Sequence, residues 1–433
     1  MLNELPDTPE HVQQELALQI ALGGPLMATK GFAAPEVRKT YTRALELCQQ
    51  REDSPQIFPV RSGLWLFYMM RAELQTARKL GMQMLAQAQR SQDTAMLLQA
   101  HHTLWPTLCW LGELPLAREH LERGMVLYNR YQHHAQAFMF GGHDPGTCSL
   151  SFAARVLWAL GYPDQAVTRL RESLTLSEEV AHPFSLVNAL FIAAPVHQFR
   201  REVAALREHA EAQIAVCREQ GFAQFLASGT ILKGWAQVEQ GQQEEGLELM
   251  RQALTSYLAT GAELWRPYFL ALLAETYGKV GQSEEGLRAL SEALALVDTT
   301  GERYYEAELY RLKGELTLQK QSKVQVPKSA VSNPQPLTPS SHAVAEAEAC
   351  FLKAIEVARK QSAKSWELRA TRSLVCLRQQ QARRDASHPT RHEARNRLAE
   401  AHSMLSEVYH WFTEGFDTKD LQEAKALIEK LRN

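Results

Sequence analysis

The phrase Gln240-Gly241-Gln242-Gln243-Glu244-Glu245-Gly246 decides the fold, because it returns 40 residues later as Val280-Gly281-Gln282-Ser283-Glu284-Glu285-Gly286. Counting backwards in the same steps reaches Arg201, and then Gly161 in Leu160-Gly161-Tyr162-Pro163-Asp164-Gln165-Ala166. Earlier copies lie at Gly112, in Leu111-Gly112-Glu113-Leu114-Pro115-Leu116-Ala117, and at Ala72. The spacing departs from 40 once, between Gly112 and Gly161, where it is 49. A fixed period in this range is the signature of stacked structural repeats.

Each copy of the signal is followed by the same pattern of side chains. Five residues on stands a small residue, with Leu206 as the exception: Ala77, Ala117, Ala166, Gly246 and Gly286. Further apolar or small residues follow nine and thirteen positions after the signal, and these spacings place all three on one helical face. Small residues allow two antiparallel helices to approach closely, and glycine supplies the backbone freedom that a tight corner needs. Each repeat is therefore predicted to be a helical hairpin.

We expect an all-α, TPR-like α-solenoid, which is a right-handed superhelix of antiparallel helix pairs with a period of about 40 residues. The tetratricopeptide repeat (TPR) itself has a period of about 34 residues, so each helix here should be about three residues longer. Residues 1–433 are expected to form one array, with a final helix at about 418–431. The expected pairs lie near 8–50, 59–91, 95–131, 149–180, 184–220, 222–260, 263–300, 304–360 and 365–411.

Two polar insertions interrupt this array at its late corners. Residues 321–342 are rich in Pro and Ser and poor in large apolar residues, so we expect a disordered loop at a helix–helix corner. A smaller insertion at 382–392 occupies the same corner of the next unit. Corners face solvent and tolerate such additions.

The bulk composition excludes several classes of partner. The chain has 433 residues, and its 47 Lys and Arg against 49 Asp and Glu leave a formal charge of −2. That balance gives no general attraction to nucleic acid or to an anionic membrane. No apolar run approaches the ~18 residues of a membrane span, and the N-terminus lacks the features of a signal peptide. The six cysteines are scattered singly, at 48, 109, 148, 217, 350 and 376, so a reducing, cytoplasmic location is expected.

A search for catalytic motifs returns nothing. The sequence contains no Gly-x-x-x-x-Gly-Lys-Ser/Thr, His-Glu-x-x-His, Gly-x-Ser-x-Gly or Gly-x-Gly-x-x-Gly. His101-His102 and Glu208-His209 are adjacent pairs without ligand spacing. We therefore expect no enzyme activity, no cofactor and no metal, with the histidines at the surface or in helix packing.

Residues 131–148 form the most unusual stretch, because the period slips there. His133, His134, His143 and Asp144 are candidates for a small polar site, since long ordered loops often carry function. In the alternative, His143 and Asp144 cap the helix that begins near Ser149, while two phenylalanines, Phe138 and Phe140, fill the widened joint.

The first helices of TPR-like units line the concave face, and here they carry aromatic, basic and His side chains. Such a face can hold a peptide or a small anionic ligand through stacking, cation–π contacts and hydrogen bonds. In the alternative, most of the Trp side chains form the core between repeats. Lys233, Arg200 and Arg266 are the better groove candidates, because a buried unpaired charge is costly. The candidate partner-binding residues are His101, His102, Trp105, His143, Asp144, His197, Arg200, Lys233, Trp235, Trp265, Arg266 and Tyr277.

Several phrases together carry a family resemblance. They include Ala28-Thr29-Lys30-Gly31-Phe32-Ala33-Ala34-Pro35, Glu302-Arg303-Tyr304-Tyr305-Glu306-Ala307-Glu308-Leu309-Tyr310-Arg311 and Trp411-Phe412-Thr413-Glu414-Gly415-Phe416-Asp417. As a set they resemble the C-terminal helical-repeat region of large bacterial proteins that join a class III adenylate/guanylate cyclase domain, a P-loop ATPase and TPR-like repeats. The resemblance covers essentially the whole chain.

The resemblance implies a regulatory or sensory arm of a signal-transduction ATPase, which would bind an inducer or a protein partner. It brings no ATP or cyclase chemistry to any residue here, because the motifs for both are missing. The favoured hypothesis is a non-catalytic scaffold or sensor arm whose partners are a protein, a peptide, a small-molecule inducer or its own upstream ATPase and cyclase domains. The alternatives are a free-standing adaptor for a peptide or protein and, with less support, an enzyme with a site in the superhelical groove.

Overall fold

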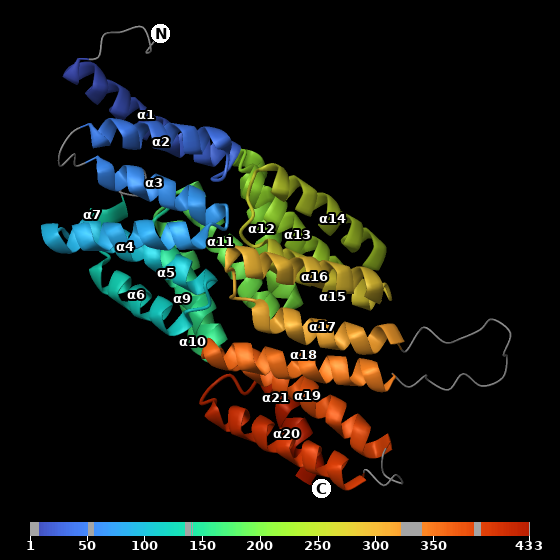
Figure 1. Ribbon diagram of the computed structural model, residues 1–433. Coiled ribbons are helices and arrows are strands. Elements are labelled where there is room, and N and C mark those ends of the chain that lie inside the picture. The colour runs from blue at the N-terminus through green and yellow to red at the C-terminus, as the bar shows by residue number, and fades with distance from the viewer. Residues whose placement is uncertain are drawn as a thin grey trace. The chain divides into compact units, whose positions relative to one another are not determined.

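The computed structural model describes residues 8–50, 56–134, 140, 142–321, 340–384 and 391–432. Within these ranges the chain forms helices and no strand, as expected, and successive helices run antiparallel (Figure 1). The helices are α1 (Pro9–Lys30), α2 (Pro35–Gln49), α3 (Ile57–Met70), α4 (Leu74–Ser91), α5 (Thr94–Trp110), α6 (Leu114–Leu127), α7 (Arg130–His133), α9 (Pro145–Leu160), α10 (Pro163–Glu179), α11 (Pro183–Phe199), α12 (Val203–Gln220), α13 (Ala223–Glu239), α14 (Gln243–Ala259), α15 (Arg266–Lys279), α16 (Ser283–Thr300), α17 (Glu306–Gln321), α18 (Ser341–Lys360), α19 (Lys364–Arg384), α20 (Arg391–Trp411) and α21 (Lys419–Arg432).

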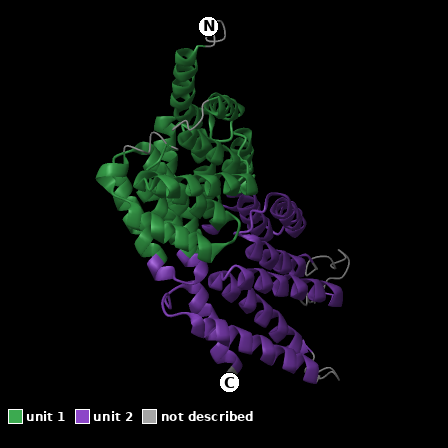
Figure 2. Ribbon diagram, turned by 60° about the vertical axis from the view of Figure 1, so that its left-hand side comes forward, with its two compact units in different colours: residues 1–156, 166–236, 248–265 green, residues 157–165, 237–247, 266–433 purple. Residues whose placement is uncertain are grey.

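The predicted helix pairs are confirmed. The 40-residue period is filled by helices such as α11 and α12, of 17 and 18 residues, joined by short corners. The chain folds into two compact units (Figure 2). Unit 1 comprises residues 1–156, 166–236 and 248–265, and unit 2 comprises residues 157–165, 237–247 and 266–433. Among the described helices, none combines the length and the apolar character that a membrane crossing requires.

The recurring signal is a helix C-cap. Every marked position has a left-handed backbone conformation, with φ of +56° at Ala72, +78° at Gly112, +98° at Gly161, +62° at Arg201, +94° at Gly241 and +80° at Gly281. In each case the next residue donates a backbone hydrogen bond to a carbonyl five residues back, as from Glu113 N to Leu108 O at 2.9 Å. This is the bonding pattern of the Schellman motif. The motif explains why Ala72 and Arg201 keep the period although neither is glycine.

The connections between helix pairs use the same left-handed backbone conformation, so substitutions at these positions should change stability. Exposed Ala181 has φ of +49° and Gly221 has φ of +77°, and a Cβ added to Gly221 would contact nothing within 4 Å. The left-handed region costs an L-residue about 1–2 kcal/mol, partly offset in the unfolded chain by the entropy of glycine. Ala181→Gly should therefore raise the free energy of unfolding in urea by about 0.5 kcal/mol, and Gly221→Ala should lower it by about 1 kcal/mol. Changes of the same sign in both variants would contradict this account.

The second helices bury one narrow stripe. In α4 the buried residues are Leu74, Ala77, Gly81, Met84 and Ala88, which alternate in steps of three and four. The predicted position thirteen residues after the corner is only half-buried here, at Leu85, and the residue before it is the buried one. On a helix of 3.6 residues per turn, two successive steps of four would carry the buried stripe off its face. Alternating steps of three and four keep the stripe on one face.

Several first helices of unit 1 are buried on nearly all sides. Every residue of α5 from Leu98 to Trp110 is buried, and α11 is buried along most of its length. The side chains of these helices therefore form the interior of the unit. In unit 2 a separate apolar core forms around Phe351, Leu374 and Leu405 from α18, α19 and α20.

The widened joint differs from its prediction at one boundary. Helix α9 begins at Pro145 and not near Ser149, because Asp144 caps it and proline is well suited to the first helical position. Phe140 packs edge-on against Phe58, with ring centroids 5.8 Å apart. Phe138 lies outside the described residues, as do 322–339 of the first predicted insertion and 385–390 of the second.

Candidate functional site

A chain of buried hydrogen bonds orients His102 in unit 1. Ser62 Oγ donates to the Phe140 carbonyl at 2.8 Å, so its oxygen accepts from Gln99 Nε2 at 2.9 Å. The Gln99 amide is thereby turned so that its Oε1 accepts from His102 Nδ1 at 3.1 Å. Because Nδ1 carries the proton, Nε2 of His102 presents its lone pair. The His102 ring is further held by stacking on Trp105, with centroids 4.9 Å apart.

His143 and Cys148 lie beside this lone pair. Nε2 of His143 is 3.0 Å from Nε2 of His102. Together with the Cys148 sulfur, these atoms lie within 4.8 Å of one another, and all three residues are buried. They line a cavity of about 40 Å³ with the amides of Asn188 and Gln224 and the ring of Trp265. Two imidazoles and a thiol are a donor set that suits a zinc ion.

Burial controls the protonation of this cluster. It lowers the pKa of His102 well below the ordinary value, and the neighbouring His143 adds to the effect. Burial also raises the pKa of the Cys148 thiol to about 12. At neutral pH His102 is therefore a neutral imidazole and Cys148 a thiol.

Asp144 is a structural cap. Its Oδ1 accepts from the backbone of Thr147 at 2.9 Å, and its Oδ2 accepts from the Tyr128 hydroxyl at 3.0 Å. His134 Nδ1 lies 3.4 Å from the same Oδ2. Asp144 therefore caps α9, whereas Nε2 of His143 faces His102 and makes no cap contact among those described.

Other predicted residues form two local clusters in unit 1. Nδ1 of His101 lies 2.8 Å from Nδ1 of His120, and both rings are buried. Glu202 accepts from Arg200 Nε at 2.8 Å and lies 2.6 Å from His197 Nδ1. Burial alone would raise the pKa of Glu202, but the hydrogen bonds from His197 and Arg200 bring it below its ordinary value.

The remaining predicted residues make separate contacts. Lys233 lies 3.5 Å from Glu211, and Arg266 Nη2 donates to Glu292 at 2.6 Å. Trp235 and Trp265 are buried and Tyr277 is half-buried. Both tryptophans are thus buried side chains of unit 1, and the ring of Trp265 also lines the cavity beside His102.

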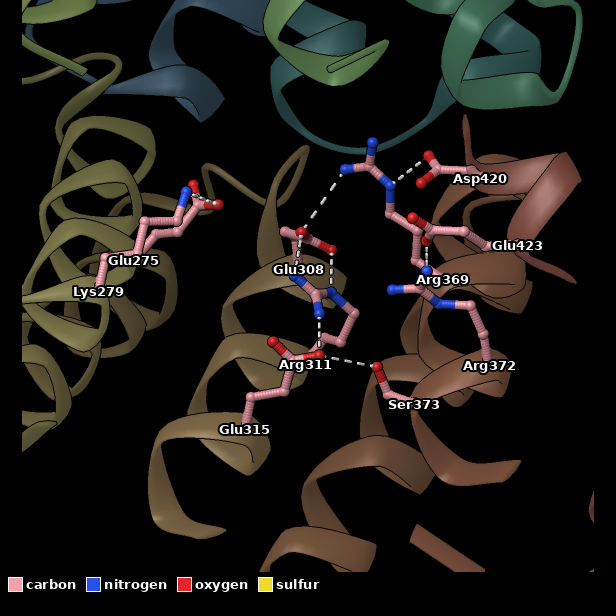
Figure 3. A network of polar contacts seen from close by, with 10 residues as sticks. All are labelled: Glu275, Lys279, Glu308, Arg311, Glu315, Arg369, Arg372, Ser373, Asp420 and Glu423. Atoms are coloured by element: carbon pink, nitrogen blue, oxygen red, sulfur yellow. Dashed lines mark hydrogen bonds and ion pairs between the residues drawn. The ribbon is translucent and has the colours of Figure 1, made fainter. Parts of the chain in front are cut away.

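Unit 2 carries a charged network whose residues were not among those predicted from the sequence (Figure 3). It runs across the first helices α15, α17 and α19 and the final helix α21. Arg311 donates from Nε and Nη2 to the two carboxylate oxygens of Glu308, at 2.8 and 2.7 Å. Arg369 Nε donates to Asp420 at 2.6 Å, and its Nη1 lies 3.6 Å from Glu308. Glu308, Arg311 and Arg369 are buried.

Partly exposed charges surround this buried centre. Glu315 bonds Arg311 and accepts from Ser373 Oγ at 3.0 Å, and Arg372 pairs with Glu423. On α15, Lys279 pairs with Glu275 at 3.2 Å. We call these five, Glu275, Lys279, Glu315, Arg372 and Glu423, the charged rim.

The buried centre of the network stays ionised. Burial alone would raise the pKa of Glu308, but Arg311 and Arg369 bring it below its ordinary value. Burial would lower the pKa of Arg311, but Glu308 and Glu315 raise it well above its usual range. The centre is therefore a set of buried charges that depend on one another.

One signal in the sequence marks this network. Glu308, Arg311 and Glu315 recur at helical spacing in a first helix, whereas α5, a first helix of unit 1, contains no Asp, Glu, Lys or Arg. The buried partners of His102 gave no such signal. Ser62, Gln99 and Cys148 come from separate repeats or turns, and only the fold brings them together.

Comparisons with known proteins agree with this architecture. A family model of the tetratricopeptide repeat matches residues 149–172, which fall on α9 and α10. No curated protein matches the sequence. Among solved structures, a Rap protein complexed with Competence and Sporulation Factor is 12% identical with a TM-score of 0.50, over 86% of this chain and 99% of that one.

Two further solved structures have lower TM-scores. The Rap conjugation regulator of plasmid pLS20, in complex with the Phr* peptide, is 10% identical over 96% of this chain and 97% of its own, with a TM-score of 0.48. A signal-transduction ATPase with a tetratricopeptide repeat sensor, from Pyrococcus horikoshii, is 12% identical over 91% of this chain and 55% of its own, with a TM-score of 0.40. The chain is thus a TPR-like helical-repeat protein in its fold.

Proposed function

We propose that this protein is a non-catalytic TPR-like scaffold that binds a peptide or protein segment on the first helices of unit 2. One observation carries the proposal: the charged rim, which alternates acidic and basic side chains across α15, α17, α19 and α21 (Figure 3). In TPR-like arrays the first helices line the inner face. The Rap protein of similar fold was solved complexed with Competence and Sporulation Factor, which is an example of binding by this architecture.

The charged network of unit 2 has a buried centre and a partly exposed rim, and this arrangement suits recognition of a charged, extended segment. Glu308, Arg311 and Arg369 are fixed by one another and hold the face rigid. Glu315 and Arg372 are only partly buried and can exchange an internal partner for one on the ligand. Such complementary charges contribute specificity and association rate more than bulk affinity.

The test uses a peptide selected on the protein itself. A random peptide library is displayed on phage and selected against the full chain, and affinities of synthetic peptides are measured by fluorescence anisotropy. We expect the double variant Glu315→Ala/Arg372→Ala to bind the selected peptide at least 10-fold more weakly, because each residue would pair with an opposite charge on it. Raising the salt concentration should weaken binding by the wild type.

The matched control removes an ion pair from the outer surface of unit 2. The side chains of Lys353 and Glu356 on α18 are 41% and 47% exposed, and their charged atoms lie 3.1 Å apart. Lys353→Ala/Glu356→Ala should bind the peptide as the wild type does. Equal affinity of all three proteins, or failure to select any peptide, would contradict binding at the charged rim.

We further propose that the chain serves as the regulatory arm of a cyclase/ATPase-type signalling protein and not as a free-standing adaptor. The support is the set of phrases shared with that family, among them Glu302–Arg311, which includes the buried pair Glu308 and Arg311. The expected partner is then a P-loop ATPase domain or an inducer that acts on it. Co-purification of the separately expressed ATPase domain of such a protein with this chain would support the arm, and its absence would favour the adaptor.

A further inference from the structure

The cluster of His102, His143 and Cys148 brings three metal-binding donor atoms together, two of which share a hydrogen bond in the absence of a metal. The Phe140–Ser62–Gln99 chain fixes the tautomer of His102, so its Nε2 lone pair faces Nε2 of His143 at 3.0 Å. A hydrogen-bonded carbonyl or amide behind a ligating imidazole is the usual outer support of a metal site, because it sets ring orientation and tautomer.

The three donor atoms have the spacing of a first coordination shell. All lie within 4.8 Å of one another, and the two Nε2 atoms are 3.0 Å apart. Zinc takes nitrogen at about 2.0–2.1 Å and thiolate sulfur at about 2.3 Å, so small side-chain movements place one ion among the three atoms. An ion here receives two imidazoles and one soft ligand.

The adjoining cavity supplies room for a fourth ligand. Its volume of about 40 Å³ exceeds the ~10–15 Å³ that one water requires. Gln224 lines it, is 3% exposed, and finds no hydrogen-bond partner for either amide atom among the described residues. A water on the ion has two protons to donate, and the buried Gln224 Oε1 is an unsatisfied acceptor at the cavity wall.

We propose that His102 Nε2, His143 Nε2 and Cys148 Sγ bind one Zn²⁺ ion, with a water in the fourth position facing the cavity. On binding, the Cys148 S–H bond breaks, a Zn–S bond forms and the proton leaves to solvent. Both imidazoles bind as neutral rings. The proton of His143, which lies on Nε2 while that atom donates to His102 Nε2, moves to Nδ1 on binding, so that both Nε2 lone pairs face the ion. No electron transfer is involved.

The ion would tie α5 to the start of α9 in unit 1. His102 belongs to α5, Cys148 to the first turn of α9, and His143 to the turn before it. This is the joint where the 40-residue period slips. Since the three ligands are assembled only in the folded chain, zinc binding adds to folding stability.

The test measures metal binding by the full chain after treatment with a chelator. ZnSO₄ titration with elemental analysis should give one equivalent of bound zinc. CoCl₂ should give the absorption of tetrahedral cobalt together with a sulfur-to-cobalt charge-transfer band. Zinc should also raise the midpoint of thermal unfolding. Cys148→Ala should abolish the charge-transfer band and weaken zinc binding more than 100-fold.

Two further variants separate the site from general effects on the core. Cys217→Ala removes another buried thiol of unit 1, on α12, and should bind zinc as the wild type does. Gln99→Leu removes the outer support of His102, together with the hydrogen bonds of Gln99 to Ser62 and Phe140, but leaves the three ligands in place. It should weaken zinc binding about 10–100-fold while retaining the charge-transfer band. Absence of that band in the wild type, or unchanged zinc affinity in a folded Cys148→Ala, would overturn the proposal.

Discussion

Replacing Glu308 by Gln should lower the free energy of unfolding of unit 2 by about 3–5 kcal/mol. The substitution keeps the shape of the side chain but removes the charge that both Arg311 and Arg369 face, at 2.7 and 3.6 Å. Two buried guanidinium groups then lose part of the negative charge that compensates them. Removing one partner of a buried ion pair costs far more stability than losing a surface pair. Urea titration measures the loss, and hydrogen exchange resolved by mass spectrometry assigns it to α17 and α19.

Two comparisons distinguish this cause from a general effect of losing a carboxylate. Glu356 is an exposed Glu of α18 that pairs with Lys353 and Lys360, so Glu356→Gln should cost less than about 1 kcal/mol. Replacing both Glu308 and Arg311 by Met removes the bidentate pair and leaves no buried Arg311 guanidinium without its partner. That double variant should be more stable than Glu308→Gln, although Arg369 loses its contact with Glu308 and retains the ion pair with Asp420. If Glu308→Gln matched Glu356→Gln, the network would not stabilise unit 2.

The repeat architecture was open to prediction because a local signal encodes it. The 40-residue period marks Schellman corners, and a corner depends on the conformation of one residue and a few neighbours. The helix pairs follow from apolar spacing within single helices. Arg201 has the left-handed φ of +62° that the corner requires although it is not glycine, so the corner forms at this position of the period even without a glycine.

The candidate sites were predicted less completely, because they depend on distances between repeats. His102 and His143 were both named from the sequence, but nothing local indicated that their Nε2 atoms lie 3.0 Å apart or that Cys148 is beside them. The division of the aromatics between groove and core was likewise undecided. It depends on how tightly the first helices close on one another, which leaves Trp105 and Trp265 in the interior of unit 1.

Acidification from pH 7 to pH 5 should destabilise the protein markedly, and His101 accounts for a defined share. Burial lowers the pKa of His101 to about 4, with His120 and Arg123 adding to the effect, whereas the unfolded side chain titrates near 6.5. Below pH 6.5 the His101 side chain therefore binds a proton in the unfolded chain but not in the folded chain. The free energy of unfolding falls as a result until about pH 4. Between pH 7 and pH 5 this loss is about 2 kcal/mol for His101 alone. Burial also lowers the pKa of His209 to about 4, which adds a second loss of the same sign.

His101→Gln isolates this contribution, because glutamine retains a hydrogen-bonding group toward His120 but does not titrate. Urea titrations at pH 7 and pH 5 should show a difference in unfolding free energy that is about 2 kcal/mol smaller than in the wild type. The control is His392→Gln on α20, where the side chain is exposed and the wild-type difference should persist. A variant at position 101 that lost as much stability as the wild type on acidification would show that this buried imidazole is not excluded from protonation. The same buried pair, with Nδ1 atoms 2.8 Å apart, would then accept a positive charge at no cost in free energy, although the burial of both rings disfavours the charged form.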